Sequence, residues 1–195
     1  MVMIALAGCT SLRGKADAAY AHGDYAKAAE MYDQLVRGGD PDAIPRRTQA
    51  REEELRVELY NVQAARAAGY EFIGKLALLL DQRDEWEGDG AAPLAGGIAF
   101  EVAAASAKIG AQVAARTDTD GPLAGEDVVN HYDKLLGHAD FASARAAIDR
   151  LLADAGRAHC TRYEAVAPTP YWRWLTARSC GHWSANRPIP ALPDP

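Results

Sequence analysis

Apolar residues recur every three or four positions along one long segment, and this pattern limits most of the chain to helical folds. Between residues 46 and about 86 they fall at Leu55, Leu59, Val62, Ala65, Gly69, Ile73, Leu76 and Leu80. Steps of three and four place side chains on one face of an α-helix, whereas a strand needs alternation at every second position. The segment is therefore predicted to be helical, with a bend or break at Gly69 or Gly74.

Composition favours helices elsewhere too. Alanine dominates the apolar residues and the 195-residue chain has only 3 Phe, which is typical of closely packed helices and not of sheets. Further helices are predicted over residues 98–115, 122–136 and 141–155. The first of these carries Ile98, Val102, Ile109 and Val113 among small residues, which indicates a central position in the fold.

The segment before residue 40 is predicted to be a helical hairpin, with helices over residues 15–21 and 25–36. Gly23 is expected to end the first helix and Asp24 to cap the second. The second helix carries an apolar stripe: Tyr25, Ala28, Ala29, Tyr32, Leu35 and Val36.

This hairpin resembles a tetratricopeptide repeat. Gly23-Asp24-Tyr25, Ala28, Tyr32 and Leu35 fall at the motif's second-helix positions. The first helix departs from the motif, because Ala16 and Ala19 stand where a glycine and a large aromatic residue are expected. The resemblance implies an all-α helical-hairpin bundle, or an irregular tetratricopeptide-like array, that presents grooves to other proteins.

The first residues include Leu6-Ala7-Gly8-Cys9, followed by Thr10. This stretch resembles the lipobox of bacterial lipoproteins, which implies a lipid on Cys9, and a residue other than Asp at position 10 implies the outer membrane. The basic and apolar regions of a signal peptide are missing, so the reading frame is expected to extend upstream. The alternative is an apolar N-terminal turn in which Cys9 is an ordinary buried thiol. The run 72–80 is too short to span a membrane, so attachment is expected through the lipid.

Two cysteines remain once Cys9 carries lipid. In an oxidising compartment Cys160 and Cys180 are expected to form a disulfide. The alternative is a metal site that combines these thiols with His159 and His182, in a metal-binding or enzymatic envelope protein.

The segment from residue 157 onward is the one basic, aromatic part of the chain. Its candidate partner-binding residues are Tyr171, Trp172, Arg173, Trp174 and Trp183, and it ends in a Pro-rich tail. One interpretation is a disulfide-pinned cap whose aromatic side chains cover the end of the helices. The other is a docking surface for a partner protein or a glycan, because Trp, Tyr and Arg are common interface anchors.

Charge and motifs narrow the function. A net charge of −6 without a long basic run argues against nucleic acid as the main partner. The arginines at 46, 47 and 51, followed by glutamates at 52–54, are interpreted as a solvated helix face. No zinc-protease, nucleophile-elbow, phosphate-loop or Cys-x-x-Cys motif is present in the sequence.

The sequence thus predicts a non-enzymatic scaffold or adaptor lipoprotein on the periplasmic face of the outer membrane. Its expected partners are other envelope proteins, and its only expected cofactor is the lipid on Cys9. Residues 1–9 are interpreted as a remnant signal and lipobox, 10–156 as the helical domain, and 157–195 as the C-terminal cap.

Overall fold

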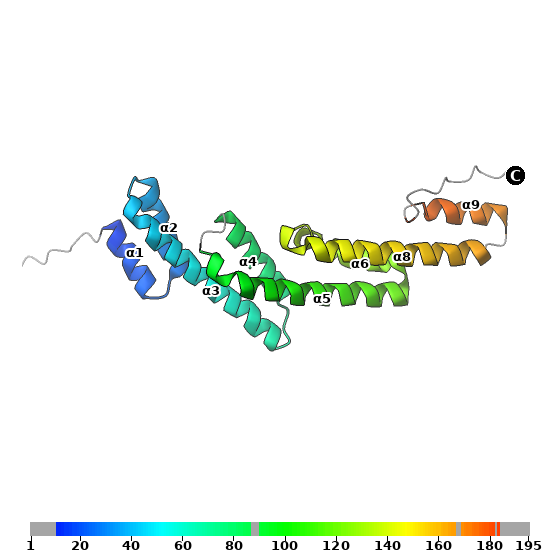
Figure 1. Cartoon of the computed structure of the whole chain (residues 1–195), viewed down its shortest axis with the longest axis horizontal. Coiled ribbons are helices and arrows are strands. Elements are labelled where there is room, and N and C mark those ends of the chain that lie inside the picture. Colours follow the sequence, from blue (N-terminus) through cyan, green and yellow to red (C-terminus); the bar gives the residue numbers. More distant parts are fainter. Residues whose placement is uncertain (1–10, 87–89, 167–168, 182, 184–195) are drawn as a thin grey trace, which may run out of the picture. The chain divides into compact units, whose positions relative to one another are not determined.

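The computed structural model describes residues 11–86, 90–166, 169–181 and 183. All regular structure in these ranges is helical, which confirms the all-α class (Figure 1). Contacts between Cα atoms divide the chain into two compact units, Met1–Glu101 and Val102–Pro195. Each unit is described by itself.

The first unit begins with the predicted hairpin. Helix α1 (Leu12–Ala21) is capped by Ser11, whose Oγ accepts a hydrogen bond from the Gly14 amide at 3.1 Å. Gly23, with φ of +79°, turns the chain into α2 (Tyr25–Arg37), and this left-handed conformation is why a glycine stands there. Asp24 occupies the N-cap position, but its side chain makes no capping hydrogen bond. Asp24 thus stands at the predicted N-cap position, but the predicted side-chain capping is wrong, because the hydrogen bond is not formed.

Small side chains let the two helices approach closely. Ala16 of α1 and Ala28 of α2 are fully buried, and Tyr32 is 1% exposed. Ala43 and Ala50, from the segment that follows, complete this core. The Tyr32 hydroxyl donates a hydrogen bond to Asp17 Oδ1 at 2.5 Å, so the one polar atom of this buried ring has a partner at the surface of α1.

Burial raises the pKa of Tyr32 to about 12, and the hydrogen bond to Asp17 adds to this effect. In the unfolded chain a tyrosine titrates near pH 10. The contribution of Tyr32 to stability is therefore fully present below pH 10 and is lost as the pH rises through 12. We expect the first unit to lose roughly 2–3 kcal/mol across this window, as measured by urea unfolding at stepped pH.

The control for this pH prediction is Tyr32→Phe, which keeps the ring and removes the titrating group. Its alkaline loss of stability should shrink to the smaller part due to Tyr20, whose pKa burial also raises. If Tyr32→Phe lost stability over the same pH range to the same extent as the parent, the assignment to Tyr32 would be wrong.

A second helical hairpin follows. After the short 3-10 helix η1 (Pro41–Ala43), α3 (Ile44–Ala67) packs against α4 (Ile73–Glu85). The break lies at Gly69, with φ of +74°, whereas Gly74 lies inside α4 without interrupting it. Apart from the exposed Gly69, the predicted stripe is buried, as Leu55, Val62, Leu76 and Leu80 show.

Two glycines let the chain pass close to α3 on its way to the next long helix. A Cβ on Gly90 would lie 2.7 Å from the Glu52 amide nitrogen, and one on Gly97 would lie 2.8 Å from Leu59 Cδ2. Between them lies the 3-10 helix η2 (Ala92–Leu94), and α5 (Ala95–Asp120) then begins. The segment Ala92–Asp120 is long and apolar enough to cross a membrane by length and composition, a criterion that interior helices of proteins also meet.

In its described residues, the second unit contains the rest of α5 and four further α-helices. Gly121 (φ +93°) and Pro122 start α6 (Pro122–His131), which is separated from α7 (Asp133–Leu136) at Tyr132. After the 3-10 helix η3 (Ala139–Phe141) come α8 (Ala142–Val166) and α9 (Pro170–Ser179). The predicted single helix over 122–136 is thus two helices, and the helix predicted to end at 155 continues to Val166.

Helix α6 lies very close to its neighbours in this unit. A Cβ on Gly125 would come within 2.1 Å of Thr117 Oγ1 on α5 and 2.7 Å of Leu152 Cδ2 on α8. Val113 of α5, Phe141 of η3 and Ile148 of α8 are buried in the same unit. This packing holds the α5–α6 turn beside α8, where the candidate site lies.

Candidate functional site

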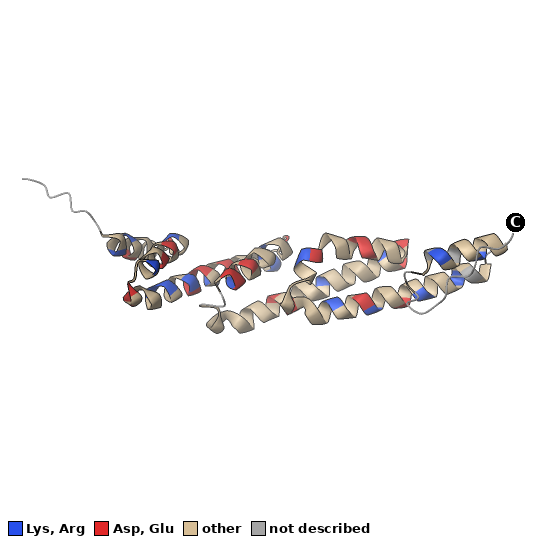
Figure 2. Cartoon of the chain, turned by 90° about the horizontal axis from the view of Figure 1, so that it is seen from above, with Lys and Arg blue, Asp and Glu red and all other residues tan. Residues whose placement is uncertain are grey.

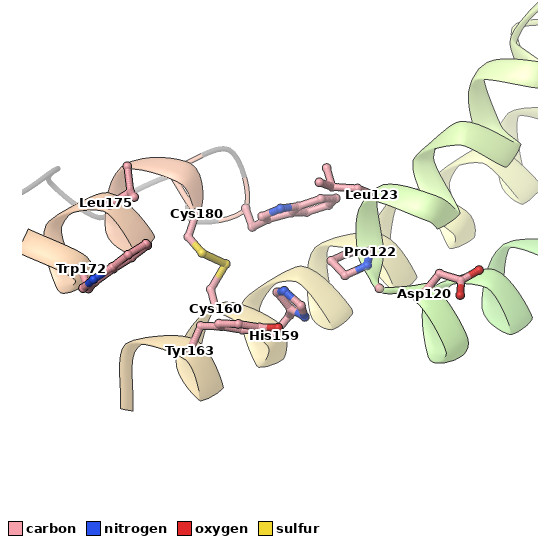
Figure 3. Close-up of a pocket in the computed structure, with 11 residues that line it drawn as sticks. Asp120, Pro122, Leu123, His159, Cys160, Tyr163, Trp172, Leu175 and Cys180 are labelled. Carbon is pink, nitrogen blue, oxygen red and sulfur yellow. A yellow bond between two sulfur atoms is a disulfide. The ribbon is translucent and has the colours of Figure 1, made fainter. Parts of the chain in front are cut away.

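A disulfide holds α9 against α8. Cys160 on α8 and Cys180, directly after α9, are bonded with their Cα atoms 5.8 Å apart (Figure 3). The two residues are 20 positions apart in sequence, so α9 folds back along α8. This confirms the predicted pairing, and cross-linking a loop of this length contributes on the order of 3 kcal/mol.

A pocket of about 320 Å³ lies beside the disulfide, and we call it the aromatic pocket. Three elements supply its walls: α8 with His159 and Tyr163, α9 with Trp172 and Leu175, and the start of α6 with Pro122 and Leu123 (Figure 3). Leu123, 65% exposed, and Trp172, 51% exposed, leave apolar surface open to solvent at this site. Such a concave, mostly apolar surface is typical of binding sites.

Trp183 completes the wall by lying directly on the backbone of α8. A Cβ on Gly156 would fall 2.2–2.5 Å from three atoms of its indole ring. Only a residue without a side chain allows the indole to lie there. Gly156 therefore determines the position of Trp183. Gly156 is not among the site residues predicted from the sequence, whereas Trp183 is.

The other aromatic candidates of α9 lie outside the pocket. The rings of Tyr171 and Trp174 are 5.9 Å apart with an interplanar angle of 30°. The guanidinium of Arg178 lies 5.3 Å from the centre of the Trp174 ring, a cation–π contact. Arg173 is exposed. The predicted set therefore divides: Trp172 and Trp183 line the pocket, whereas Tyr171, Arg173 and Trp174 do not.

A wider groove adjoins the aromatic pocket and shares His159 and Tyr163 with it. Their rings are 4.5 Å apart and tilted by 38°, so they form one wall of both hollows. The groove has a volume of about 650 Å³ and a polar lining that includes Asp118 and Arg162. A bound segment could thus place an apolar side chain in the pocket and polar groups along the groove.

Two of the four ligands of the alternative metal site, the thiols of Cys160 and Cys180, are not free to bind a metal. Both sulfur atoms of Cys160 and Cys180 are in the disulfide, and zinc binds the thiolate form. Within the described residues no group of three or more His, Cys, Asp and Glu side chains could hold a metal ion. His182 and the lipid-attachment candidate Cys9 lie outside the described residues.

Pro122 and Leu123 were also missing from the sequence-based site. They lie about 40 positions before Cys160, and only the packing of α6 against α8 brings them to the pocket. A glycine inside a helical pattern, such as Gly156, is the kind of signal that indicates close packing. For Leu123 the sequence offers no comparable signal.

Comparison of the chain with protein-family models, curated proteins and solved structures gives no match.

Proposed function

We propose that this protein is a lipid-anchored helical adaptor of the bacterial cell envelope, and that it binds another envelope protein at the aromatic pocket. The observation that carries the proposal is the pocket itself, in which a disulfide holds Trp172 and Leu175 of α9 opposite Leu123 of α6. Tryptophan and tyrosine dominate the binding energy of many protein interfaces when they lie in or around such pockets.

The pocket is already formed without a partner. The disulfide fixes the end of α9, and the contact between Trp183 and the Gly156 backbone fixes the indole. A wall that is rigid before binding loses less conformational entropy when a partner side chain enters, so more of the contact energy remains as affinity. A preformed wall of this kind supports a docking function beyond the structural role of a cap.

The other parts of the proposal rest on the first half of the chain. The hairpin α1–α2, with Ala28 and Tyr32 buried between its helices, resembles the tetratricopeptide hairpins that serve as adaptors. Anchoring rests on the lipobox-like Leu6-Ala7-Gly8-Cys9. Together they support an adaptor tethered at one end, with the aromatic pocket in its second unit.

Site-specific cross-linking tests the docking function. A photoreactive phenylalanine analogue at position 123 should cross-link a defined envelope protein in cells, and mass spectrometry should identify that protein reproducibly. The matched control is position 78 on α4, because Leu78 is 69% exposed and Leu123 is 65% exposed. We expect no cross-link to the same protein at 78. Equal cross-linking at the two positions, or none at 123, would contradict docking at the pocket.

The anchor is tested separately with Cys9→Ser. Expressed behind a complete signal peptide, the parent chain should partition with membranes after processing, and the Cys9→Ser variant should be released or remain unprocessed. Equal partitioning of the two proteins would contradict lipid attachment at Cys9 and would leave the docking test unaffected.

A further inference from the structure

We propose that the second unit has a membrane-binding tip, formed where α8 ends and α9 begins, that binds the surface of anionic phospholipid bilayers. The tip consists of Val166, Tyr171 and Trp172, with Arg162 and Arg173 beside them in the sequence. This contact is separate from the lipid on Cys9. The tip shares Trp172 with the aromatic pocket, and Arg162 and Val166 with the adjoining groove, whereas Tyr171 lines neither hollow.

The apolar part of the tip is exposed to solvent. Val166 is 69% exposed, Tyr171 53% and Trp172 51%, and only three residues separate the end of α8 from the start of α9. Tyr171 and Trp172 contact each other edge to face, with ring centres 6.3 Å apart. Tyrosine and tryptophan combine an apolar ring with a polar group, and for this reason they concentrate at membrane–water interfaces.

The charge around the tip is opposite to that of the rest of the protein. Residues 157–183 contain four arginines and one glutamate, although the whole chain carries a net charge of −6. Figure 2 shows the basic residues along the second half of α8 and along α9. Arg162 and Arg173 are both exposed. An anionic bilayer attracts this end of the second unit and repels the acidic remainder of the chain. The second unit is therefore expected to bind the bilayer through the tip.

The combination favours a membrane over an acidic protein surface as the binding partner. The exposed aromatic residues lie at a helix–helix connection, where they can enter the headgroup region without unfolding either helix. The flanking arginines can stay at the level of the phosphates, which is how interfacial anchors are arranged. A single acyl chain binds membranes only marginally, so a second, electrostatic contact of this kind would matter for a lipoprotein.

Vesicle binding tests the proposal. The full chain carrying Cys9→Ser, with its disulfide formed, is mixed with phosphatidylcholine vesicles that contain or lack phosphatidylglycerol, and the bound fraction is measured by flotation. We expect binding to the phosphatidylglycerol vesicles that weakens as salt is added. The double variant Arg162→Gln/Arg173→Gln should bind roughly 25-fold more weakly, since each arginine contributes about a factor of five.

The apolar contribution is tested with Val166→Ser/Tyr171→Ser. This variant should bind the vesicles about tenfold more weakly than the parent. Its matched control is Tyr60→Ser/Tyr70→Ser, because Tyr60 is 69% exposed and Tyr70 is 73% exposed in the first unit. The control should bind as the parent does. Circular dichroism should show the parent's helix content in every variant, since all the changed residues are exposed.

Three results would overturn the proposal: no binding to phosphatidylglycerol vesicles, equal binding to both vesicle types, or tip variants that bind like the parent. If Val166→Ser/Tyr171→Ser abolished the cross-link from position 123 but left vesicle binding unchanged, the tip would be part of a protein interface instead. Leu123→Glu should leave vesicle binding intact, so failure of the docking proposal can be distinguished from failure of this one.

Discussion

Replacing Arg66 with methionine is expected to lower the thermal unfolding midpoint of the first unit by roughly 10 °C. Glu101 is fully buried, and it accepts hydrogen bonds from Arg66 Nε at 2.7 Å and from Arg66 Nη2 at 3.1 Å. These hydrogen bonds raise the pKa of Arg66, so the guanidinium stays charged. Without it, a carboxylate would be buried with no cation to balance it, which is strongly destabilising.

The reverse substitution should be milder. In Glu101→Met the guanidinium of Arg66, whose side chain is 35% exposed, can turn toward water and still contact the Phe100 ring, now 5.0 Å away. The double variant Arg66→Met/Glu101→Met should be more stable than Arg66→Met alone, because replacing both charges with apolar groups leaves no buried ion. Scanning calorimetry of the four proteins measures this asymmetry.

A surface ion pair provides the control. Arg56 lies one turn from Glu52, and its side chain is 52% exposed, so Arg56→Met should shift the midpoint by only about 1–2 °C. A similar shift for Arg66→Met would show that Glu101 finds water or another partner, and the packing of α5 on α3 would need revision.

Local patterns were sufficient to predict the first hairpin and the helical character of the segment that follows it. The stripe from Leu55 to Leu80 follows the helical period, and its side chains are buried between α3 and α4 because that period places them on one face. Gly69 breaks the helix, but Gly74 does not, since a glycine in a helix weakens it without requiring a left-handed conformation. At Tyr132, where α6 ends, neither glycine nor proline marks the break.

Cross-helix contacts were not predictable from such patterns. The sequence pattern predicts a solvated helix face for the arginines near position 50. In the structure Arg47 and Arg51 lie 3.3 Å and 3.7 Å from Asp33 on α2, and their side chains are only 22% and 15% exposed. Sequence spacing identifies neighbours one turn apart on the same helix, but it does not identify a carboxylate supplied by another helix.

In the candidate site, too, local features were predictable from the sequence and contacts between helices were not. The disulfide followed from the number of cysteines and the expected compartment, and the aromatic residues of α9 were evident from composition. Which of them share a pocket depends on the face of α9 that contacts α8, and Trp172 and Leu175 differ from Tyr171 in this respect. Leu123 reaches the pocket only through the packing of α6, which depends on the absence of a side chain at Gly125.

Gly156→Ala is expected to displace Trp183 and to destabilise the second unit by about 1–2 kcal/mol. Alanine is intrinsically better than glycine in a helix by about 1 kcal/mol, so the substitution would be stabilising if nothing lay over it. In the structure the new Cβ would fall 2.2 Å from Trp183 Cδ2. The ring must therefore move away and lose its contact with the α8 backbone.

The matched substitution is Gly110→Ala in α5, because a Cβ there would have no neighbouring atom within 4 Å. This variant should be more stable than the parent by about 0.5–1 kcal/mol. Urea unfolding of the two variants therefore gives effects of opposite sign for the same chemical change in two helices of the chain. If both variants were stabilised, Trp183 would not lie on Gly156.

Displacement of the indole can also be observed directly. With 5-fluorotryptophan incorporated at the chain's 4 tryptophans, the ¹⁹F resonance assigned by Trp183→Phe should shift toward its solvent-exposed value in Gly156→Ala. The Trp86 resonance, from the first unit, should stay in place. Because Trp183 is one wall of the aromatic pocket, the same variant should also weaken the cross-link from position 123. A moved Trp183 with an undiminished cross-link would show that the partner contacts α6 without entering the pocket.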